Sequence, residues 1–238
     1  MAAFVVGAAW VFLGAACAPF RVLDLPAAPA HADPNRQSRM GLTLSARLLD
    51  DEASRESYFG PGFRDSGILP VIIAIENRGQ SSFDLRRADL HLVLENGERF
   101  EPIAPGDVFE SSRRPFTVAF LLAPLIVPPI LFANHISEHN FELSRALALK
   151  SLPSRLRVEP GDPPGSRAVF YRDPVADRRS TRAYDSATLQ VTVEREGERP
   201  EEEGLEVAAA DPTAAPGLRG TVGRVITYTL ALAREAFP

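Results

Sequence analysis

The sequence predicts a mainly β protein, an antiparallel β-sandwich that is interrupted by a hydrophobic and helical insertion. Three observations lead to this fold class. Short stretches of alternating apolar and polar residues recur along the chain, and turn residues separate them. One of these turns, Asn96-Gly97, is typical of a β-hairpin, because both of its central positions need a positive φ. The third observation is an uncharged run over 116–133, which lies between the predicted strands.

Six or seven short strands account for most of the predicted domain. The strongest signal is a β-branched run that includes Val71, Ile73 and Ile75 and ends at Asn77. The aromatic residues around the glycines of 58–63 favour a bulge or an edge-covering turn. The other strands are expected at 40–50, on both sides of Asn96-Gly97, around 156–158 and 168–171, at 187–196 and at 223–233.

Composition and charge exclude several classes of function. The chain has 238 residues, 45% of them apolar and 24% charged, which is ordinary for a soluble globular protein. Its net charge of −5 provides no basic field for phosphates, so no nucleic-acid partner is expected. The glycines form no phosphate-binding loop, and the serines form no Gly-x-Ser-x-Gly elbow. We therefore expect no cofactor and no enzymatic activity.

The N-terminal stretch 1–17 indicates export. It is apolar, carries no charged side chain, and ends in the only cysteine of the chain, Cys17. The stretch resembles the signals of bacterial lipoproteins, in which a Leu-Ala-Gly/Ala-Cys box precedes lipid attachment to the cysteine. Ala15 and Ala16 fit that box, whereas Leu13 stands one place too early and no Lys or Arg precedes the apolar core. The resemblance implies lipid attachment at Cys17.

Two alternatives to lipid attachment stay open. Ala30-His31-Ala32 offers a cleavage site for simple secretion, although it lies far beyond the apolar core. The apolar stretch can also remain uncleaved as an anchor. All three interpretations imply export or membrane attachment. We expect a membrane-anchored protein of the bacterial cell envelope that faces the periplasm or the exterior. We expect a signal over 1–17, an Ala/Pro-rich tether over 18–39, and a domain over 40–238 with its insertion at about 113–150.

The order of strands and turns carries a family resemblance over about residues 67–172. A strand ends in Asn77, a second strand meets a polar-Gly turn, and a Leu-x-Val-x-Pro-Gly string precedes a Gly and a Phe. The residues of this string and its continuation are Leu156, Val158, Pro160, Gly161, Gly165 and Phe170. The pattern resembles the immunoglobulin-like extracellular domains of uncharacterised bacterial lipoproteins. This resemblance implies an immunoglobulin-like sandwich at the cell envelope and brings no catalytic residues.

The uncharged run 116–133 is the candidate contact with a membrane or a partner. By length it is a borderline span, and Pro124, Pro128 and Pro129 would break a regular helix in lipid. Three interpretations stay open: an insertion that packs over the sandwich or is covered by a partner, a loop that dips into the membrane, and a true span. A true span would separate strands of one domain across the membrane. The candidate contact residues are Phe116, Phe120, Leu121, Leu125, Ile126, Ile130 and Phe132.

The string HISEH, which ends at His139, has the spacing of one class of zinc peptidase. On a helix expected over about 134–149, His135 and His139 lie one turn apart on the same face, with Glu138 nearby. Zinc hydrolysis also needs a third ligand from another element and a pocket. We expect no metal site here. The apolar positions of this helix are typical of a packing stripe: Ile136, Leu143 and Leu147.

Together these features predict an exported, lipid-anchored cell-envelope protein that acts as a non-enzymatic binding or assembly module. Membrane lipid would be its partner at the N-terminus, and an envelope protein is the candidate partner at the apolar insertion. An integral membrane protein that spans at 116–133 is the second hypothesis. A zinc-dependent hydrolase that uses the HISEH string is the third.

Overall fold

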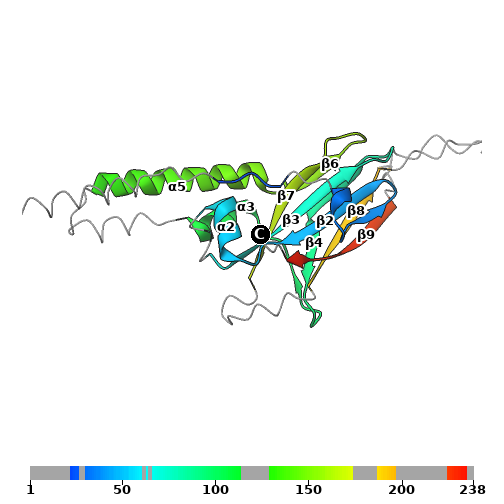
Figure 1. Cartoon of the computed structure of the whole chain (residues 1–238), viewed down its shortest axis with the longest axis horizontal. Helices are drawn as coiled ribbons and strands as arrows, with labels where there is room; N and C mark the ends of the chain where they lie inside the picture. Colours follow the sequence, from blue (N-terminus) through cyan, green and yellow to red (C-terminus); the bar gives the residue numbers. More distant parts are fainter. Residues whose placement is uncertain are drawn as a thin grey trace, which may run out of the picture.

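The computed structural model describes residues 22–26, 30–60, 63, 66–113, 129–173, 187–196 and 224–234 (Figure 1). For 129–135, 224 and 233–234 it describes the course of the backbone only. The elements in chain order are η1 (Ala30–Ala32), β1 (Gln37–Arg39), β2 (Leu42–Leu48), α2 (Glu52–Phe59), β3 (Ile68–Asn77), β4 (Phe83–Val93), β5 (Arg99–Phe100), α3 (Pro105–Ser112), α5 (Pro129–Lys150), β6 (Arg155–Val158), β7 (Gly165–Arg172), β8 (Thr188–Arg195), β9 (Arg224–Ala231) and β10 (Ala233–Arg234).

The strands form two sheets, each with five strands. One sheet has the order β1-β2-β3-β7, and β10 also pairs with β2. The other has the order β5-β4-β8-β9, and β6 also pairs with β4. Every pairing between these strands is antiparallel except the short one between β10 and β2. The prediction of a mainly β protein built from antiparallel sheets is therefore confirmed.

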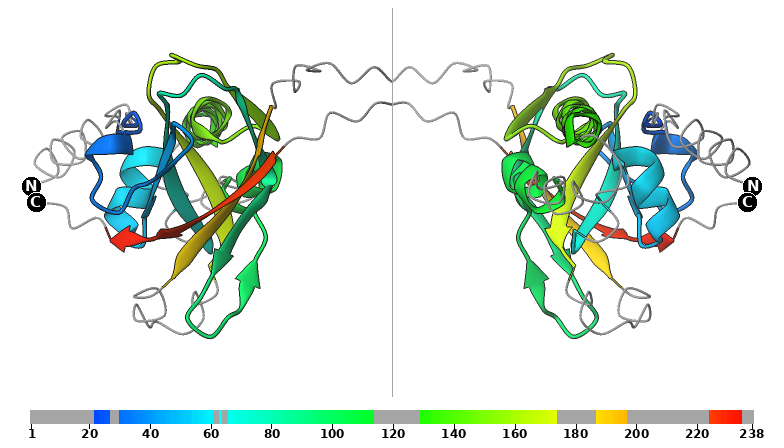
Figure 2. Two further views of the ribbon diagram at one scale, coloured as in Figure 1. Left: turned by 90° about the vertical axis from the view of Figure 1, so that its right-hand side faces the viewer. Right: turned by 90° about the vertical axis from the view of Figure 1, so that its left-hand side faces the viewer.

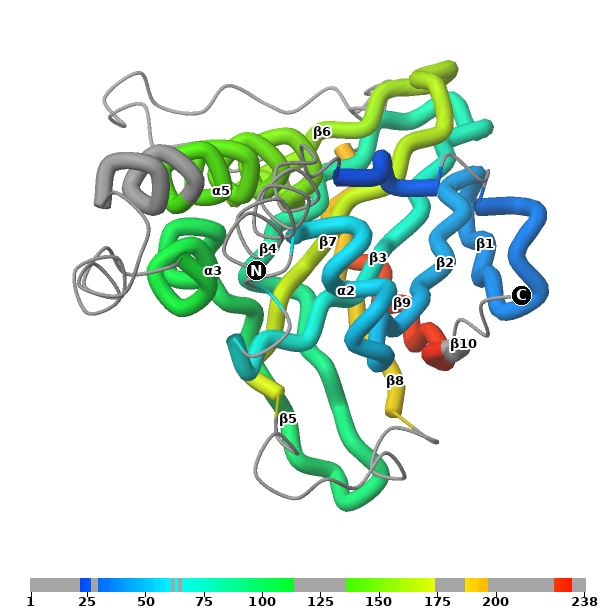
Figure 3. The backbone as a smooth tube through the Cα atoms, turned by 60° about the vertical axis from the view of Figure 1, so that its left-hand side comes forward, coloured from blue at the N-terminus to red at the C-terminus, as the bar shows by residue number. Residues whose placement is uncertain are grey.

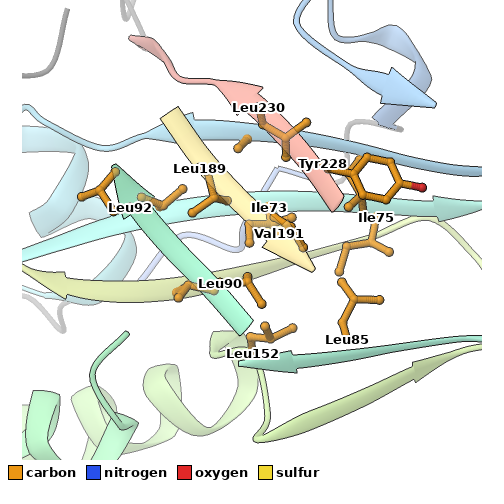
Figure 4. Packing of buried hydrophobic residues seen from close by; sticks show 14 of the residues in the cluster. Ile73, Ile75, Leu85, Leu90, Leu92, Leu152, Leu189, Val191, Tyr228 and Leu230 are labelled. Carbon is orange, nitrogen blue, oxygen red and sulfur yellow. The ribbon is translucent and has the colours of Figure 1, made fainter. Parts of the chain in front are cut away.

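A common hydrophobic core joins the two sheets. Alternate residues of the long strands point into it, such as Leu42 and Leu44 on β2 and Leu189 and Val191 on β8. Figure 4 shows core side chains meeting from both sheets, such as Ile73 of β3 and Val191 of β8, together with the ring of Tyr228 on β9. The Tyr228 hydroxyl donates to the carbonyl oxygens of Arg39 and Leu42, at 3.1 and 3.2 Å, which also ties β9 to the first sheet.

A second core lies on the other face of the β1-β2-β3-β7 sheet, beneath the helices. Strand β3 contributes to both cores, because Val71 and Ile73 face the other sheet while Ile72 faces the helices. This explains why its sequence reads as a nearly continuous apolar run. The molecule is therefore layered as helices, sheet and sheet (Figure 3), with α5 seen end-on in Figure 2.

Helix α2 ends within the stretch 58–63, where the sequence favoured a bulge or an edge-covering turn. Asp51 caps its first turn by accepting a hydrogen bond from Ser54 N at 2.8 Å, and Gly60 ends it with φ of 100°. The aromatic residues that follow each other here are buried rather than edge-covering. Phe59 and Phe63 stack at 4.8 Å between ring centroids, and both rings contact Phe170 of β7.

Helix α5 confirms the predicted helix and begins about one turn earlier. Pro129 stands at its first position, where proline is well tolerated because the missing N–H has no partner in a helix. The predicted stripe packs inward, since Ile136, Leu143 and Leu147 are all buried. Helix α3, which the sequence analysis did not predict, packs against α5. Both helices lie on the same side of β7 as α2.

The described part of the expected tether belongs to the folded body. Within 18–39, β1 pairs with β2 and Ala30 is buried. Asp33 is also buried and accepts a hydrogen bond from Arg47 at 3.2 Å. The boundary of the domain therefore lies further toward the N-terminus than residue 40. This segment gave no apolar period because its described elements, η1 and β1, have only three residues each.

Candidate functional site

The segment Val22–Pro26, which we call the N-terminal strap, crosses the helical layer of the molecule. Leu23 N donates to the carbonyl oxygen of Ser57 in α2 at 2.8 Å. The Ser166 hydroxyl of β7 donates to the carbonyl oxygen of Pro26 at 2.7 Å. Leu25 packs against the second core. The strap is thus fixed at both ends and in the middle by contacts with three different parts of the body.

Lys150, the last residue of α5, completes the attachment of the strap. It is the only lysine of the chain, and its Nζ donates to the carbonyl oxygens of Leu23 and, at 2.7 Å, Tyr58. The ammonium also lies 5.8 Å from the centroid of the Phe59 ring. Burial lowers the pKa of Lys150 to about 8, and the Asp24 carboxylate opposes this shift. One cation therefore joins the strap, α2 and α5.

The strap and helices α2, α3 and α5 together form what we call the helical face. Three large apolar side chains on it are exposed: Leu23 by 51%, and Phe141 and Leu149 of α5 by 65% each. Phe141 and Leu149 point away from the buried stripe of their helix. Elsewhere in the described residues, the exposed large apolar side chains are Met40 and Val225. Apolar exposure is thus concentrated on the helical face.

The opposite surface, the outer face of the sheet that contains β4 and β8, is covered by ion pairs. Arg86 pairs with Glu194 at 2.7 Å and Arg157 with Glu196 at 2.5 Å. A further pair joins Arg155 to Asp84 at 2.5 Å. The bound Arg155 guanidinium holds the pKa of the Asp84 carboxyl below its ordinary value. Such pairs contribute little stability when exposed but make this face strongly hydrated.

A small pocket lies between the strap and the β1-β2-β3-β7 sheet. Its polar lining comes from Asp33, Ser45, Arg47 and Ser166, and it has room for little more than a water molecule. Asp33 and Arg47 already pair with each other. The one carboxylate of the pocket lining is therefore already engaged in an ion pair.

Near this pocket, Glu76 is buried between two cationic or polar side chains. It accepts a hydrogen bond from Arg78 Nε at 2.5 Å and lies 2.7 Å from His31 Nδ1. Burial raises the pKa of Glu76, but the hydrogen bonds to His31 and Arg78 outweigh this effect and lower it. This cluster fixes η1 on β3, and its one carboxylate is fully engaged. Its role in the described structure is that of a structural ion pair.

The HISEH residues do not form a described metal site. Both histidines lie on α5, where His139 is buried and Glu138 is exposed, while the side chain of His135 is outside the described part. Within the residues that the structure describes, no three His, Cys, Asp or Glu side chains are grouped to hold a metal ion. The described residues therefore supply no third zinc ligand to the HISEH histidines, which the zinc-hydrolase hypothesis requires.

The predicted lipid-attachment residue Cys17 lies outside the described residues, and so do Phe116, Phe120, Leu121, Leu125 and Ile126. For Ile130 and Phe132 only the backbone is described, in the first turns of α5. The two ends of this apolar stretch are placed, however, because α3 ends at Ser112 and α5 begins at Pro129. Both ends belong to the helical face.

Among the described helices, none combines the length and apolarity that crossing a membrane requires. Four residues of the helical face were not predicted from the sequence as functional candidates: Leu23, Phe141, Leu149 and Lys150. The helical period alone could have identified Phe141 and Leu149, because both fall off the apolar stripe of α5. No sequence signal could have identified Lys150, whose acceptors are backbone oxygens of distant segments.

Comparisons with protein-family models, curated proteins and solved structures found no match to the chain.

Proposed function

We propose that this protein is an exported, lipid-anchored component of the bacterial cell envelope that acts as a non-enzymatic binding or assembly module. One observation carries the proposal: the strap and the two helices that flank the apolar stretch, α3 and α5, lie on the same side of the molecule, the helical face. The strap begins only five residues after Cys17, and the opposite face of the molecule carries ion pairs. In this proposal the body is an immunoglobulin-like sandwich held at a membrane through Cys17.

The apolar stretch between α3 and α5 is the proposed contact with lipid or with an envelope protein. A single span through the bilayer is less well supported. Strand β5 precedes the stretch and β6 follows it, yet both pair with β4. Helices α3 and α5, which flank the stretch directly, also pack against each other. Because the elements before and after the apolar stretch belong to the same folded domain, both ends of the stretch should lie on the same side of the membrane.

The anchor is tested by comparing the wild type with Cys17→Ala in a bacterial host. We expect a lipid adduct in the intact mass of the wild type alone, because the thiol of Cys17, the only cysteine of the chain, is the proposed attachment point. The wild type should sediment with membranes, and Cys17→Ala should appear in the soluble periplasm. The two forms must be compared at equal expression. Retention of both forms in the membrane without an adduct would show that another segment is the anchor.

The contact function is tested on the soluble Cys17→Ala form. We expect it to float with phospholipid vesicles or to self-assemble, and the double variant Leu121→Glu/Leu125→Glu should lose this binding by about tenfold or more, because ionised carboxylates resist entry into an apolar contact. Val225→Glu, an exposed apolar position on β9, is the matched control and should bind unchanged. A Cys17→Ala form that stays monomeric and ignores vesicles contradicts the proposed contact.

A further inference from the structure

The distance from the lipid-attachment site to the strap is short. Val22 follows Cys17 by five residues, and a fully extended link of this length reaches at most about 18 Å. The strap itself cannot lengthen the link while its contacts hold. Leu23 is held through both its N–H and its carbonyl oxygen, and Pro26 through its carbonyl oxygen. A lipid on Cys17 would therefore keep the helical face close to the bilayer surface.

The thickness of the molecule makes the opposite orientation unreachable. Packed sheets lie about 10 Å apart, and a layer of helices adds roughly another 10 Å. The outer face of the β4–β8 sheet is thus about 20 Å or more from the strap, on the far side of both cores. To place that face on the bilayer, the link would have to pass around the edge of the body. A link of about 18 Å is too short for this path.

The exposed side chains of the helical face favour the same orientation as the short link to Cys17 does. Leu23, Phe141 and Leu149 expose apolar surface whose transfer into lipid is favourable. Arg145 lies between the last two on α5 and is long enough to keep its guanidinium in water while its stem covers apolar surface. The opposite face carries ion pairs that would lose hydration on a bilayer, which is costly. The helical face also carries ion pairs, Arg113 with Glu110 and Arg145 with Glu142, so the short link decides the orientation and charge alone does not.

We infer that the helical face docks directly on the lipid bilayer, with Leu23, Phe141 and Leu149 at the membrane surface, and that Lys150 sets this orientation by fixing the strap. The inference rests on the proposed lipid attachment at Cys17. The occupant of the helical face is the phospholipid bilayer that holds the anchor. The sheet carrying β4 and β8 then faces away from the membrane and presents its charged surface to the surrounding space.

The test uses the full-length lipidated protein in vesicles of phosphatidylethanolamine and phosphatidylglycerol that contain nitroxide-labelled lipid. A thiol-reactive fluorophore is attached in three separate variants, Phe141→Cys, Leu149→Cys and Val225→Cys. Lipid-modified Cys17 has no free thiol, so the label reports on the new position alone. Val225 is the matched control, because it is 58% exposed and apolar but belongs to β9. We expect quenching by the nitroxide lipid to be several-fold stronger at 141 and 149 than at 225.

Lys150→Met tests the strap within the same assay. Methionine keeps an apolar stem but cannot donate to Leu23 and Tyr58, so the strap loosens and the difference in quenching between positions 141 and 225 should shrink. Arg99→Met removes an exposed cation of β5, outside the helical face, and should leave the difference unchanged. Circular dichroism verifies that each variant is folded. The three labelled variants that retain Lys150 test the docking by themselves.

The outcomes separate the inference from the proposed function. A wild type without a lipid adduct in its intact mass refutes the anchor itself, before any label is added. A lipidated protein that is quenched equally at all three positions, or most strongly at 225, overturns the docking of the helical face. Labels at 141 and 149 that are shielded from water in native membranes but unquenched in vesicles also overturn it, because a partner protein then covers the face.

Discussion

Lys150 shows how one side chain can connect segments that are far apart in the sequence. Its Nζ reaches carbonyl oxygens of Leu23 and Tyr58, which lie 127 and 92 positions away. A buried ammonium is stable only when its protons have acceptors, and these two carbonyl groups supply them. An arginine would be too large and planar for this point contact, which is consistent with lysine appearing once in a chain rich in arginine.

The lowered pKa of Lys150 gives the protein a pH-dependent stability. The pKa is about 8 in the folded state, against 10.5 for an ordinary lysine, because burial disfavours the charged form. Between these values the unfolded chain binds more protons at this site than the folded chain does. The free energy of unfolding must therefore rise with pH across this window. The neutral amine keeps two N–H donors, so both carbonyl contacts can persist.

The measurement is urea unfolding of the wild type and Lys150→Met at pH values below, within and above the window. We expect the wild type to gain stability relative to Lys150→Met as the pH rises from about 8 to about 10.5. Other titrating groups are common to both proteins and cancel in the comparison. Arg145→Met should show no such pH-dependent difference from the wild type. A Lys150→Met difference that is constant with pH would contradict the burial of the ammonium.

Two turns of the sheets depend on glycine for different reasons. Gly41, between β1 and β2, has φ of 88°, and a Cβ there would lie 2.3 Å from Gly79 Cα in the β3–β4 connection. Gly97, in the β4–β5 hairpin, has a similar φ of 81°, but a Cβ at that position would meet no other atom within 4 Å. The first glycine therefore allows two turns to approach each other, whereas the second only allows a left-handed backbone.

We expect Gly41→Ala to destabilise the protein by about 2 kcal/mol or more and Gly97→Ala by about 1 kcal/mol. Both variants carry the strain of a positive φ, but only the first adds a clash between backbones, which cannot move aside as a flexible side chain can. Urea unfolding of the two variants beside the wild type gives the comparison. Equal losses would show that the β1–β2 turn moves away from Gly79 at little cost.

The short helices and the strap depend on the sheet for their stability. Helices α2 and α3 have eight residues each, which is too short for an isolated helix in water. They form because Phe59 of α2 and Val108 of α3 are buried in the second core with Phe170 of β7. The same core receives Leu25 from the strap. The layer on the helical face is therefore one cooperative unit with the sheet beneath it.

Removal of the strap should raise the chemical reactivity of Lys150, the only lysine of the chain. A chain that begins at Ala30 lacks the strap, which uncovers Lys150, whereas a chain that begins at Val22 retains it. We expect an amine-acylating reagent to modify Lys150 at least about tenfold faster in the shorter chain, because the amine is then more exposed and free of one acceptor. Peptide mapping by mass spectrometry separates this lysine from the terminal amine. Equal rates in both chains would show that the strap does not cover Lys150.

Much of the fold followed from local pattern. Strand stretches such as 67–79 and 187–196 were predicted because alternation and β-branched runs report directly on which face of a strand is buried. Helix α5 was predicted from its apolar stripe. Helices α2 and α3 were not, because Phe59 and Val108 become core residues only through contacts with β7. The candidate site was predicted least, since carbonyl acceptors carry no side-chain signature.

The sequence by itself determined the mainly β architecture, the position of α5 and the expectation of an N-terminal lipid anchor, because each depends on residues that are close together in the chain. The tertiary structure decided that residues 22–39 belong to the body as far as they are described, that Lys150 joins the strap to α2 and α5, and that Leu23 is exposed on the same side of the molecule as Phe141 and Leu149. These features depend on which distant segments meet. Which segments meet is decided by how the two cores bury their apolar surface, and no pattern of neighbouring residues indicates it.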